Sequence, residues 1–209
     1  MADENILEGL TSALWDNSDA LEYLEGRGLS LNTIAEARFG YVEKGRFRNS
    51  ISIPYFDAKG RHRITRYRTL ELDADQKYSV VKGTKTHLYG VEDVNEPVVF
   101  ITEGEFDRWI LKQLDLKAVA VSGATHFQRP WRFLFRNCDL VLIVTDNDPS
   151  NIKKGREVGQ AGQRAAQRIA AWIGTVTNVD VVGLPPRTDV TDLFLSDPDT
   201  LRSLCELPS

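Results

Sequence analysis

Short apolar runs in the second half of the chain are the feature that most limits its fold. They are Val98–Ile101, Ala118–Val121 and Leu140–Val144, and Val179–Val182 forms a fourth run around one aspartate. Continuous apolar runs are typical of strands buried on both faces, and segments of helical length separate these. From Val158 to Ile173, apolar residues recur at spacings of three and four, which predicts an amphipathic helix. The pattern predicts a mostly parallel α/β sheet flanked by helices, with right-handed crossovers.

The front part of the chain has a different character. Residues 18–40 predict two short helices with Ser18 and Ser30 as N-caps and Gly40 as a stop. Residues 51–70 alternate on either side of the turn Asp57–Gly60, which predicts a β-hairpin. A further extended segment is expected at residues 77–81.

The two parts are expected to be separate domains, a smaller basic α+β subdomain over residues 1–95 and an α/β domain over residues 96–209. Net charge is only −4, but Lys44 to Lys85 holds eleven Lys/Arg against four Asp/Glu. A basic segment of this kind suits contact with a phosphate backbone or a triphosphate, although exposed strands also carry Lys and Arg for solubility.

Acidic residues follow three of the four apolar runs. The candidate metal ligands among them are Glu103, Asp107, Asp146, Asp148 and Asp189. Ligands of open parallel sheets gather at the carboxyl ends of the strands, so these acids are expected to converge on one edge. Like charges at close range oppose ionisation unless cations neutralise them, and Mg²⁺ or Mn²⁺ suits carboxylate oxygens.

Each acidic cluster also has a purely structural interpretation. Glu103 and Asp189 could cap the helices that follow them, and Asp146 and Asp148 could be ordinary loop acids. The joint occurrence of three clusters at strand ends favours the metal site.

Other site types have little support. Two cysteines, Cys138 and Cys205, and three scattered histidines make no four-ligand zinc pattern, so zinc is not expected and both thiols are expected to be reduced and partly buried. No apolar stretch approaches the roughly 20 residues that span a bilayer, and the expected location is the cytoplasm.

The acidic clusters resemble the signatures of TOPRIM domains. Residues 103–107 (E-G-E-F-D) fit the E-G-x-x-D signature, and residues 146–148 (D-N-D) fit the D-x-D signature. TOPRIM domains occur in primases, topoisomerases, nucleases and repair proteins, so these motifs alone identify a metal site and leave the reaction open.

The front part resembles the catalytic core of bacterial and phage (DnaG-type) primases. Its segments that are similar to motifs of that family are residues 23–30 (Y-L-E-G-R-G-L-S), 53–54 and 59–61 of the hairpin, 66–68 (R-Y-R), 77–78 (K-Y) and 88–90 (L-Y-G). In the second half, Ser122-Gly123 and residues 189–193 also match. The resemblance covers nearly the whole chain.

The resemblance implies roles for individual residues. Glu103, Asp146 and Asp148 would hold two or more catalytic Mg²⁺ or Mn²⁺ ions, with Asp107 and Asp189 nearby. The bases that would face the ribonucleoside triphosphate or the template are Arg66, Arg68, Lys77 and Lys85.

The chain departs from the family in one segment. Residues 149–159 are longer and more basic than the usual link after D-x-D, and they leave open whether Gly155 or Gly162 matches the family's glycine. Lys153, Lys154 and Arg156 lie there, either beside nucleic acid or on a surface loop.

The resemblance therefore implies a DNA primase catalytic core that makes short RNA primers on single-stranded DNA during replication. A zinc-binding module and a replicative helicase are expected as partners in trans, no membrane is expected, and trimmed cores of this kind suggest a phage or plasmid origin. Two alternatives stay open: a TOPRIM metal-dependent nuclease, and a non-catalytic single-strand-binding replisome adaptor.

Overall fold

The chain forms two compact units, Met1–His87 and Leu88–Ser209, which are described separately. The computed structural model describes residues 4–123, 126–147, 151–153, 156–158 and 161–206. Sequence placed the division near residue 95, but Leu88 and Val94 are buried in the core of the second unit. The connecting residues 88–95 therefore pack with the α/β part.

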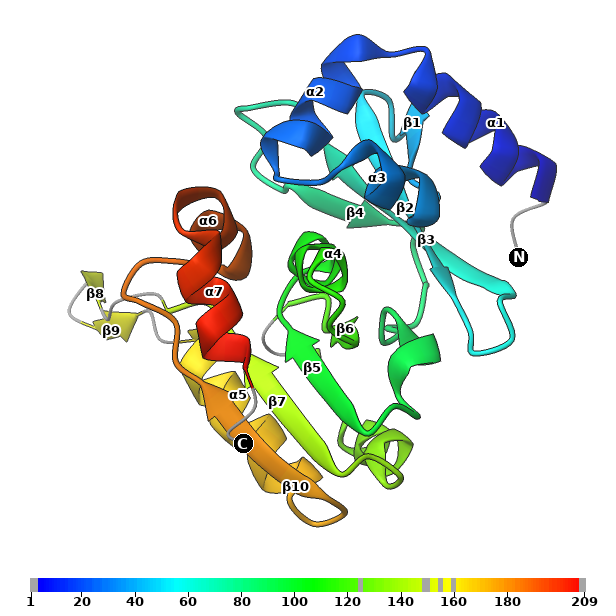
Figure 1. Ribbon diagram of the computed structural model, residues 1–209. Helices are drawn as coiled ribbons and strands as arrows, with labels where there is room; N and C mark the ends of the chain where they lie inside the picture. Colours follow the sequence, from blue (N-terminus) through cyan, green and yellow to red (C-terminus); the bar gives the residue numbers. More distant parts are fainter. Residues whose placement is uncertain (1–3, 124–125, 148–150, 154–155, 159–160, 207–209) are drawn as a thin grey trace. The chain divides into compact units, whose positions relative to one another are not determined.

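The first unit joins three helices to an antiparallel sheet (Figure 1). The helices are α1 (Glu4–Trp15), α2 (Ser18–Gly26) and α3 (Leu31–Glu36), and the strands, in sheet order, are β1 (Gly40–Val42), β2 (Ser50–Phe56), β3 (His62–Thr69) and β4 (Tyr78–Val80). The predicted hairpin is β2 and β3, and the two predicted short helices are α2 and α3. The sequence interpretation did not include α1 or β1.

Local hydrogen bonds explain the ends of these elements. Asp57 Oδ1 accepts from the backbone N–H groups of Lys59 and Arg61, which closes the hairpin turn. The Arg61 side chain bonds the same carboxylate, and although partial desolvation acts in the opposite direction, these bonds lower the pKa of Asp57 to about 2. Ser30 caps α3 as predicted, but α2 is capped by Asn17 and not by Ser18, because the Asn17 side chain accepts from Ala20 N.

The second unit is built on a four-stranded parallel sheet (Figure 1). Its order is β10 (Asn178–Val182), β7 (Leu140–Val144), β5 (Val98–Thr102) and β6 (Ala118–Ala120). All three pairings are parallel, so the predicted strands and their parallel arrangement are confirmed.

Helices cover both faces of this sheet. The helix α4 (Glu105–Gln113) packs against β5, β6 and α6 (Val190–Ser196), and α7 (Pro198–Cys205) packs on α6. The helix α5 (Ala161–Ile173) packs against β7, β10 and the 3₁₀ helix η2 (Arg129–Phe135). The segment between β6 and β7 therefore contains a 3₁₀ helix where its length suggested an α-helix, and the Pro130 ring at the start of η2 removes one backbone donor.

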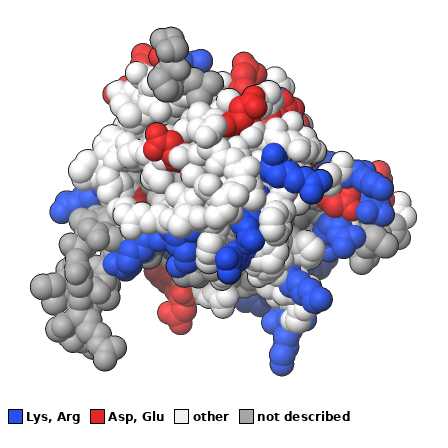
Figure 2. Space-filling view, turned by 90° about the horizontal axis from the view of Figure 1, so that it is seen from below, with Lys and Arg blue, Asp and Glu red and all other residues white. Residues whose placement is uncertain are grey.

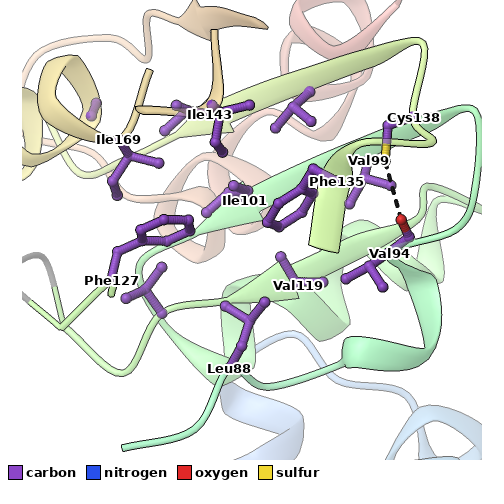
Figure 3. Packing of buried hydrophobic residues seen from close by; sticks show 14 residues of the cluster. Leu88, Val94, Val99, Ile101, Val119, Phe127, Phe135, Cys138, Ile143 and Ile169 are labelled. Carbon is purple, nitrogen blue, oxygen red and sulfur yellow. Dashed lines mark hydrogen bonds between the residues drawn. The ribbon is translucent and has the colours of Figure 1, made fainter. Parts of the chain in front are cut away.

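The main core lies between the sheet and the layer of α5 and η2 (Figure 3). Strand residues Val99, Ile101 and Ile143 meet Phe127 and Phe135 there, and all five are at most 3% exposed. The rings of Phe127 and Phe135 are stacked with centroids 6.4 Å apart. This packing fixes the sheet, and therefore the edge from which the acidic residues project.

Both cysteines are free and buried, in agreement with the predicted reduced thiols. The Cys138 thiol donates to the carbonyl of Val94 at 3.1 Å, as Figure 3 shows. Burial raises the pKa of the Cys205 thiol to about 11, so at neutral pH it is almost entirely protonated and unreactive.

A buried arginine joins α4 to the start of the second unit. Arg108 is 1% exposed; its Nε donates to the carbonyl of Ala118, and its NH2 group contacts Glu92 and Asp93. Gly90 has φ of +81°, and a Cβ atom there would lie 2.1 Å from Arg108 Nε. Only glycine satisfies both the left-handed backbone and the close approach.

Residues 149–159, the segment that departs from the primase family, contain a short hairpin. Its strands are β8 (Asn151–Lys153) and β9 (Arg156–Val158), paired antiparallel. Lys154 and Gly155 lie outside the described residues, and both interpretations of this segment, contact with nucleic acid and a surface loop, stay open. None of the helices in the described part of the chain has the length and apolar character needed to cross a membrane.

Candidate metal centre and basic surface

The carboxyl ends of β5, β7 and β10 meet at one edge of the parallel sheet (Figure 1). Ile101 is level with Ile143, and Val144 is level with Val182. The residues that follow these strands, Glu103 among them, therefore leave the sheet on the same side. This edge is where ligands of parallel sheets bind.

Glu103 and the backbone of Asp146 meet at Gly162, in the first turn of α5. A Cβ atom at Gly162 would lie 3.0 Å from Glu103 Oε2 and 2.9 Å from the Asp146 carbonyl oxygen. The Glu103 Oε2 atom is itself buried. Two of the three acidic segments thus approach the same point, and glycine is the residue that permits it.

This contact bears on the glycine that the sequence left open. Gly162 lies against both acidic segments, whereas Gly155 is outside the described residues. The contact favours Gly162, and the choice between the two glycines stays open.

We expect Gly162→Ala to destabilise the second unit by about 1–3 kcal/mol, because the added methyl group overlaps a backbone oxygen that cannot turn aside. Chemical unfolding monitored by tryptophan fluorescence measures the change. Gly9→Ala is the matched control: Gly9 is also inside a helix, has nothing within 4 Å of its added Cβ, and should gain up to about 1 kcal/mol. Equal effects of the two substitutions would contradict the close approach at Gly162.

Asp107 is buried and joins α4 to α6. Its Oδ1 accepts from the Thr191 backbone N–H at 3.2 Å and from the Thr191 hydroxyl at 2.7 Å. Thr191 lies in the first turn of α6, where backbone N–H groups have no partner within the helix. The carboxylate therefore fastens the two helices together, and its predicted place near the metal stays a prediction.

Asp189 is the N-cap of α6, which was the structural alternative to a metal role. Its Oδ1 accepts from Asp192 N at 2.6 Å. One carboxylate oxygen is thus occupied by the helix end, and a role toward a metal stays a prediction.

Asp146 follows β7, and Asp148 lies outside the described residues. Between them, Asn147 bonds to the segment before α6 and to α5 through four hydrogen bonds. The sequence interpretation named the two aspartates of D-x-D and not Asn147. The position of Asn147 between them was the signal that could have found it.

Two carboxylate residues at one sheet edge are a partial ligand set for a divalent ion. Within the described ranges, no three His, Cys, Asp or Glu side chains form a metal-binding group. Mg²⁺ commonly uses one or two protein carboxylates and completes its shell with water and phosphate oxygens. The buried Glu103 oxygen beside the Asp146 loop fits such an ion.

The predicted bases lie in the first unit. Arg66 and Arg68 project from the same face of β3, and their guanidinium groups lie over the Tyr78 ring at 4.5 and 5.1 Å from its centroid. Arg68 Nε also donates to the Tyr23 hydroxyl at 2.9 Å. The two cations are therefore held in fixed positions by aromatic rings. Lys77 and Lys85 are exposed, Lys77 directly before β4 and Lys85 in the loop that follows it.

A polar pocket opens on the other face of β3, which the sequence interpretation missed. It has a volume of about 270 Å³ and is lined by Arg46, Phe47, Arg48, Ser50, Tyr67, Thr69, Glu71, Ala74, Gln76 and Ser79. Side chains alternate between the faces of a strand, so Tyr67 and Thr69 point away from Arg66 and Arg68. The rings of Phe47 and Tyr67 stack with centroids 4.0 Å apart and planes 6° apart.

Cationic and aromatic side chains in one pocket suit single-stranded nucleic acid, which offers phosphates and unstacked bases. Arg46, Phe47 and Arg48 were visible in the sequence as a basic-aromatic run, but their meeting with Tyr67 depends on pairing along the sheet. Figure 2 shows clusters of exposed Lys and Arg on one face of the molecule, with some Asp and Glu beside them. A local excess of positive charge can attract phosphate in spite of the net charge of −4.

Comparison with known proteins identifies relatives of this fold. No family model matches the chain. The DNA primase of Enterobacteria phage T4 is 28% identical over 138 residues, which are 59% of this chain and 36% of that protein. The chain thus spans about a third of the length of that curated relative.

Solved structures share the fold over nearly the whole chain. The zinc-binding and RNA polymerase domains of the Aquifex aeolicus primase give a TM-score of 0.80 at 18% identity, covering 96% of this chain and 58% of that one. A DnaG primase catalytic domain bound to single-stranded DNA gives 0.74 at 21% identity, covering 96% and 78%. The chain has the fold of a DnaG-type primase catalytic core.

Proposed function

We propose that this chain is the catalytic core of a DNA primase, which joins ribonucleotides into short primers on single-stranded DNA. The observation that carries the proposal is the approach of Glu103 and the Asp146 loop at one edge of the parallel sheet. The primase-core fold and the similarity to a phage DNA primase support it.

Glu103, Asp146 and Asp148 would hold the divalent ions, Mg²⁺ or Mn²⁺, with Asp107 and Asp189 close to them. A bound divalent ion stabilises the negative charge that develops on phosphate and assists ionisation of the attacking hydroxyl. The chain's own contribution is to bring carboxylates from separate strands to one edge. A Mg²⁺ ion held by one or two carboxylates keeps coordination positions for triphosphate oxygens.

Arg66 and Arg68 would bind the phosphates of the incoming ribonucleoside triphosphate. Their planar guanidinium groups match pairs of phosphate oxygens, and the Tyr78 ring holds both in place. Lys77 and Lys85 would add mobile point charges on the same unit. The bonds to Tyr23 and Tyr78 reduce the entropy that Arg68 loses when it binds phosphate.

The pocket around Arg46, Arg48 and Tyr67 would bind the template strand. A relative of the same fold has been solved with single-stranded DNA, and the pocket combines positive charge with stacked rings. A replicative helicase and a zinc-binding module would act in trans; the primase fragment of the phage T7 primase-helicase protein shares the fold, with a TM-score of 0.63. Such a protein would work in the bacterial cytoplasm during phage replication.

Primer synthesis tests the proposal directly. The chain is incubated with single-stranded DNA, the four ribonucleoside triphosphates and Mg²⁺ or Mn²⁺, with and without candidate partner proteins. Short RNA products are expected. Cleavage of nucleic acid in the absence of nucleotides would indicate a nuclease, and single-strand binding without either reaction in any divalent metal would indicate an adaptor.

We expect the double substitution Arg46→Ala, Arg48→Ala to weaken binding of single-stranded DNA several-fold at moderate salt. Each lost phosphate contact should lower the slope of log affinity against log salt by about 0.7. Fluorescence anisotropy of a labelled oligonucleotide across a salt series measures both quantities.

The control removes the same charge elsewhere in the unit. Arg61 and Arg63 both pair with Asp57 in the hairpin and do not line the pocket. Arg61→Ala, Arg63→Ala should leave affinity closer to that of the unmodified chain. Equal losses in the two double variants would show that general charge, and not this pocket, attracts the strand.

A further inference from the structure

Asn147 lies between the two aspartates of the D-x-D loop and makes four hydrogen bonds. Its backbone N–H donates to the Thr188 carbonyl at 3.1 Å, and its own carbonyl accepts from Arg187 N at 2.8 Å. Its side-chain Nδ2 donates to the Leu184 carbonyl at 2.5 Å, and its Oδ1 accepts from Gln163 Nε2 at 2.9 Å. One residue therefore connects the loop after β7 to two other segments.

The connected segments each carry or touch a predicted metal residue. Asp146 directly precedes Asn147, and Asp189 directly follows Thr188. Gln163 is next to Gly162, which lies against Glu103. Asn147 is thus the residue through which the Asp146 loop is held to the segment that leads to Asp189 and to the helix that borders Glu103.

The side-chain bonds need an amide of this size. An amide donates and accepts at once, so it satisfies the Leu184 carbonyl and the Gln163 amide together. An aspartate could not donate to the carbonyl, and an alanine could do neither. The two backbone bonds would survive either change, so the loop would keep its general path and lose its fixed position.

We propose that Asn147 is a positioning residue, whose side-chain amide sets where Asp146 presents its carboxylate relative to Glu103 and Asp189. The inference rests on the proposed function, because it concerns the same divalent-ion site. It predicts that Asn147 affects how tightly the ion binds without touching the ion. Residues that orient metal ligands in this way change metal affinity or activity by about 10- to 100-fold when they are replaced.

The test compares Asn147→Ala with Asn178→Ala in the full chain. Asn178 is a matched control, because its side chain also donates to a backbone carbonyl, that of Asp139, at the opposite end of the same strands. Mn²⁺ alone is titrated, and free ion is measured by electron paramagnetic resonance. Asn147→Ala should weaken Mn²⁺ binding about tenfold or more, and Asn178→Ala should leave it unchanged.

A second readout separates positioning from general damage. Primer synthesis by Asn147→Ala should need about tenfold more Mg²⁺ for half-maximal rate and should recover much of its rate at saturating Mg²⁺. Gln163→Leu removes one of the two side-chain bonds and should shift both quantities in the same direction by a smaller factor. If Asn147→Ala does not fold, Gln163→Leu tests the positioning role in its place.

The outcomes distinguish the two proposals. Suppose that the unmodified chain binds Mn²⁺ and makes primers. If folded Asn147→Ala and Gln163→Leu then bind Mn²⁺ as tightly as the unmodified chain, the positioning role is overturned and the proposed function stands. If the unmodified chain neither binds Mn²⁺ nor makes primers, the proposed function fails and takes the positioning role with it.

Discussion

Asp146→Asn is expected to lower primer synthesis by about a thousandfold or more. The substitution keeps the shape of the side chain and removes the negative charge that the divalent ion needs. Stabilisation of developing charge by a bound metal is worth several kcal/mol, and each 1.36 kcal/mol changes a rate tenfold. Glu103→Gln should have an effect of the same order, because the two residues approach the same edge of the sheet.

The measurement is the yield of short RNA products on a single-stranded template at several Mg²⁺ and Mn²⁺ concentrations. Asp180→Asn is the control, since Asp180 is an exposed acid on β10 that lies within the strand and away from its carboxyl end. Its activity should stay near that of the unmodified chain. Primer synthesis by Asp146→Asn at the normal rate would remove Asp146 from the metal site.

Arg108→Met is expected to destabilise the second unit by about 3–5 kcal/mol. The change removes the bonds to Asp93, Glu92 and the Ala118 carbonyl. Asp93 is 5% exposed, so its carboxylate would be left buried, and its partners among the described residues would be the Ala118 N–H at 3.3 Å and the more distant Lys112 ammonium at 4.0 Å. Breaking a buried ion pair by removing one partner has a cost of this size.

Urea unfolding measures the loss, and a second variant shows its cause. Asp93→Asn in the Arg108→Met background removes the uncompensated charge, so the double variant should recover part of the lost stability. Lys112→Met is the control, because Lys112 lies at the edge of the same cluster and is more exposed than Arg108. A double variant no more stable than Arg108→Met would show that packing, and not charge, explains the effect.

Local patterns were sufficient for much of the fold. Continuous apolar runs predicted β5, β6 and β7, because strands buried on both faces carry few polar residues. The valines around Asp180 predicted β10, which is a half-exposed strand at the edge of the sheet. Alternation of apolar and polar residues on either side of a turn predicted β2 and β3, because successive side chains of a strand point to opposite faces. The helix α1 was missed although it carries an apolar stripe, and β1 is only three residues long, too short for a periodicity to show.

The acids after the strands could also be placed on one edge from sequence, because parallel strands end on the same side. What each carboxylate does there was not determined. Asp107 accepts from Thr191, 84 residues away, and Asp189 caps its own helix. The sequence offered capping for Asp189 as an alternative, but no pattern in it indicated the bond to Thr191.

By itself, then, the sequence determined the four strands of the parallel sheet, their parallel direction and the acids that follow three of them, because these come from patterns within a few residues. Only the tertiary structure decided that Gly162 borders Glu103, that Asn147 joins three segments, and that Tyr67 meets Phe47 at a pocket. These contacts join residues that are distant along the chain. Their partners are chosen by packing of the whole unit, which leaves no local pattern to read.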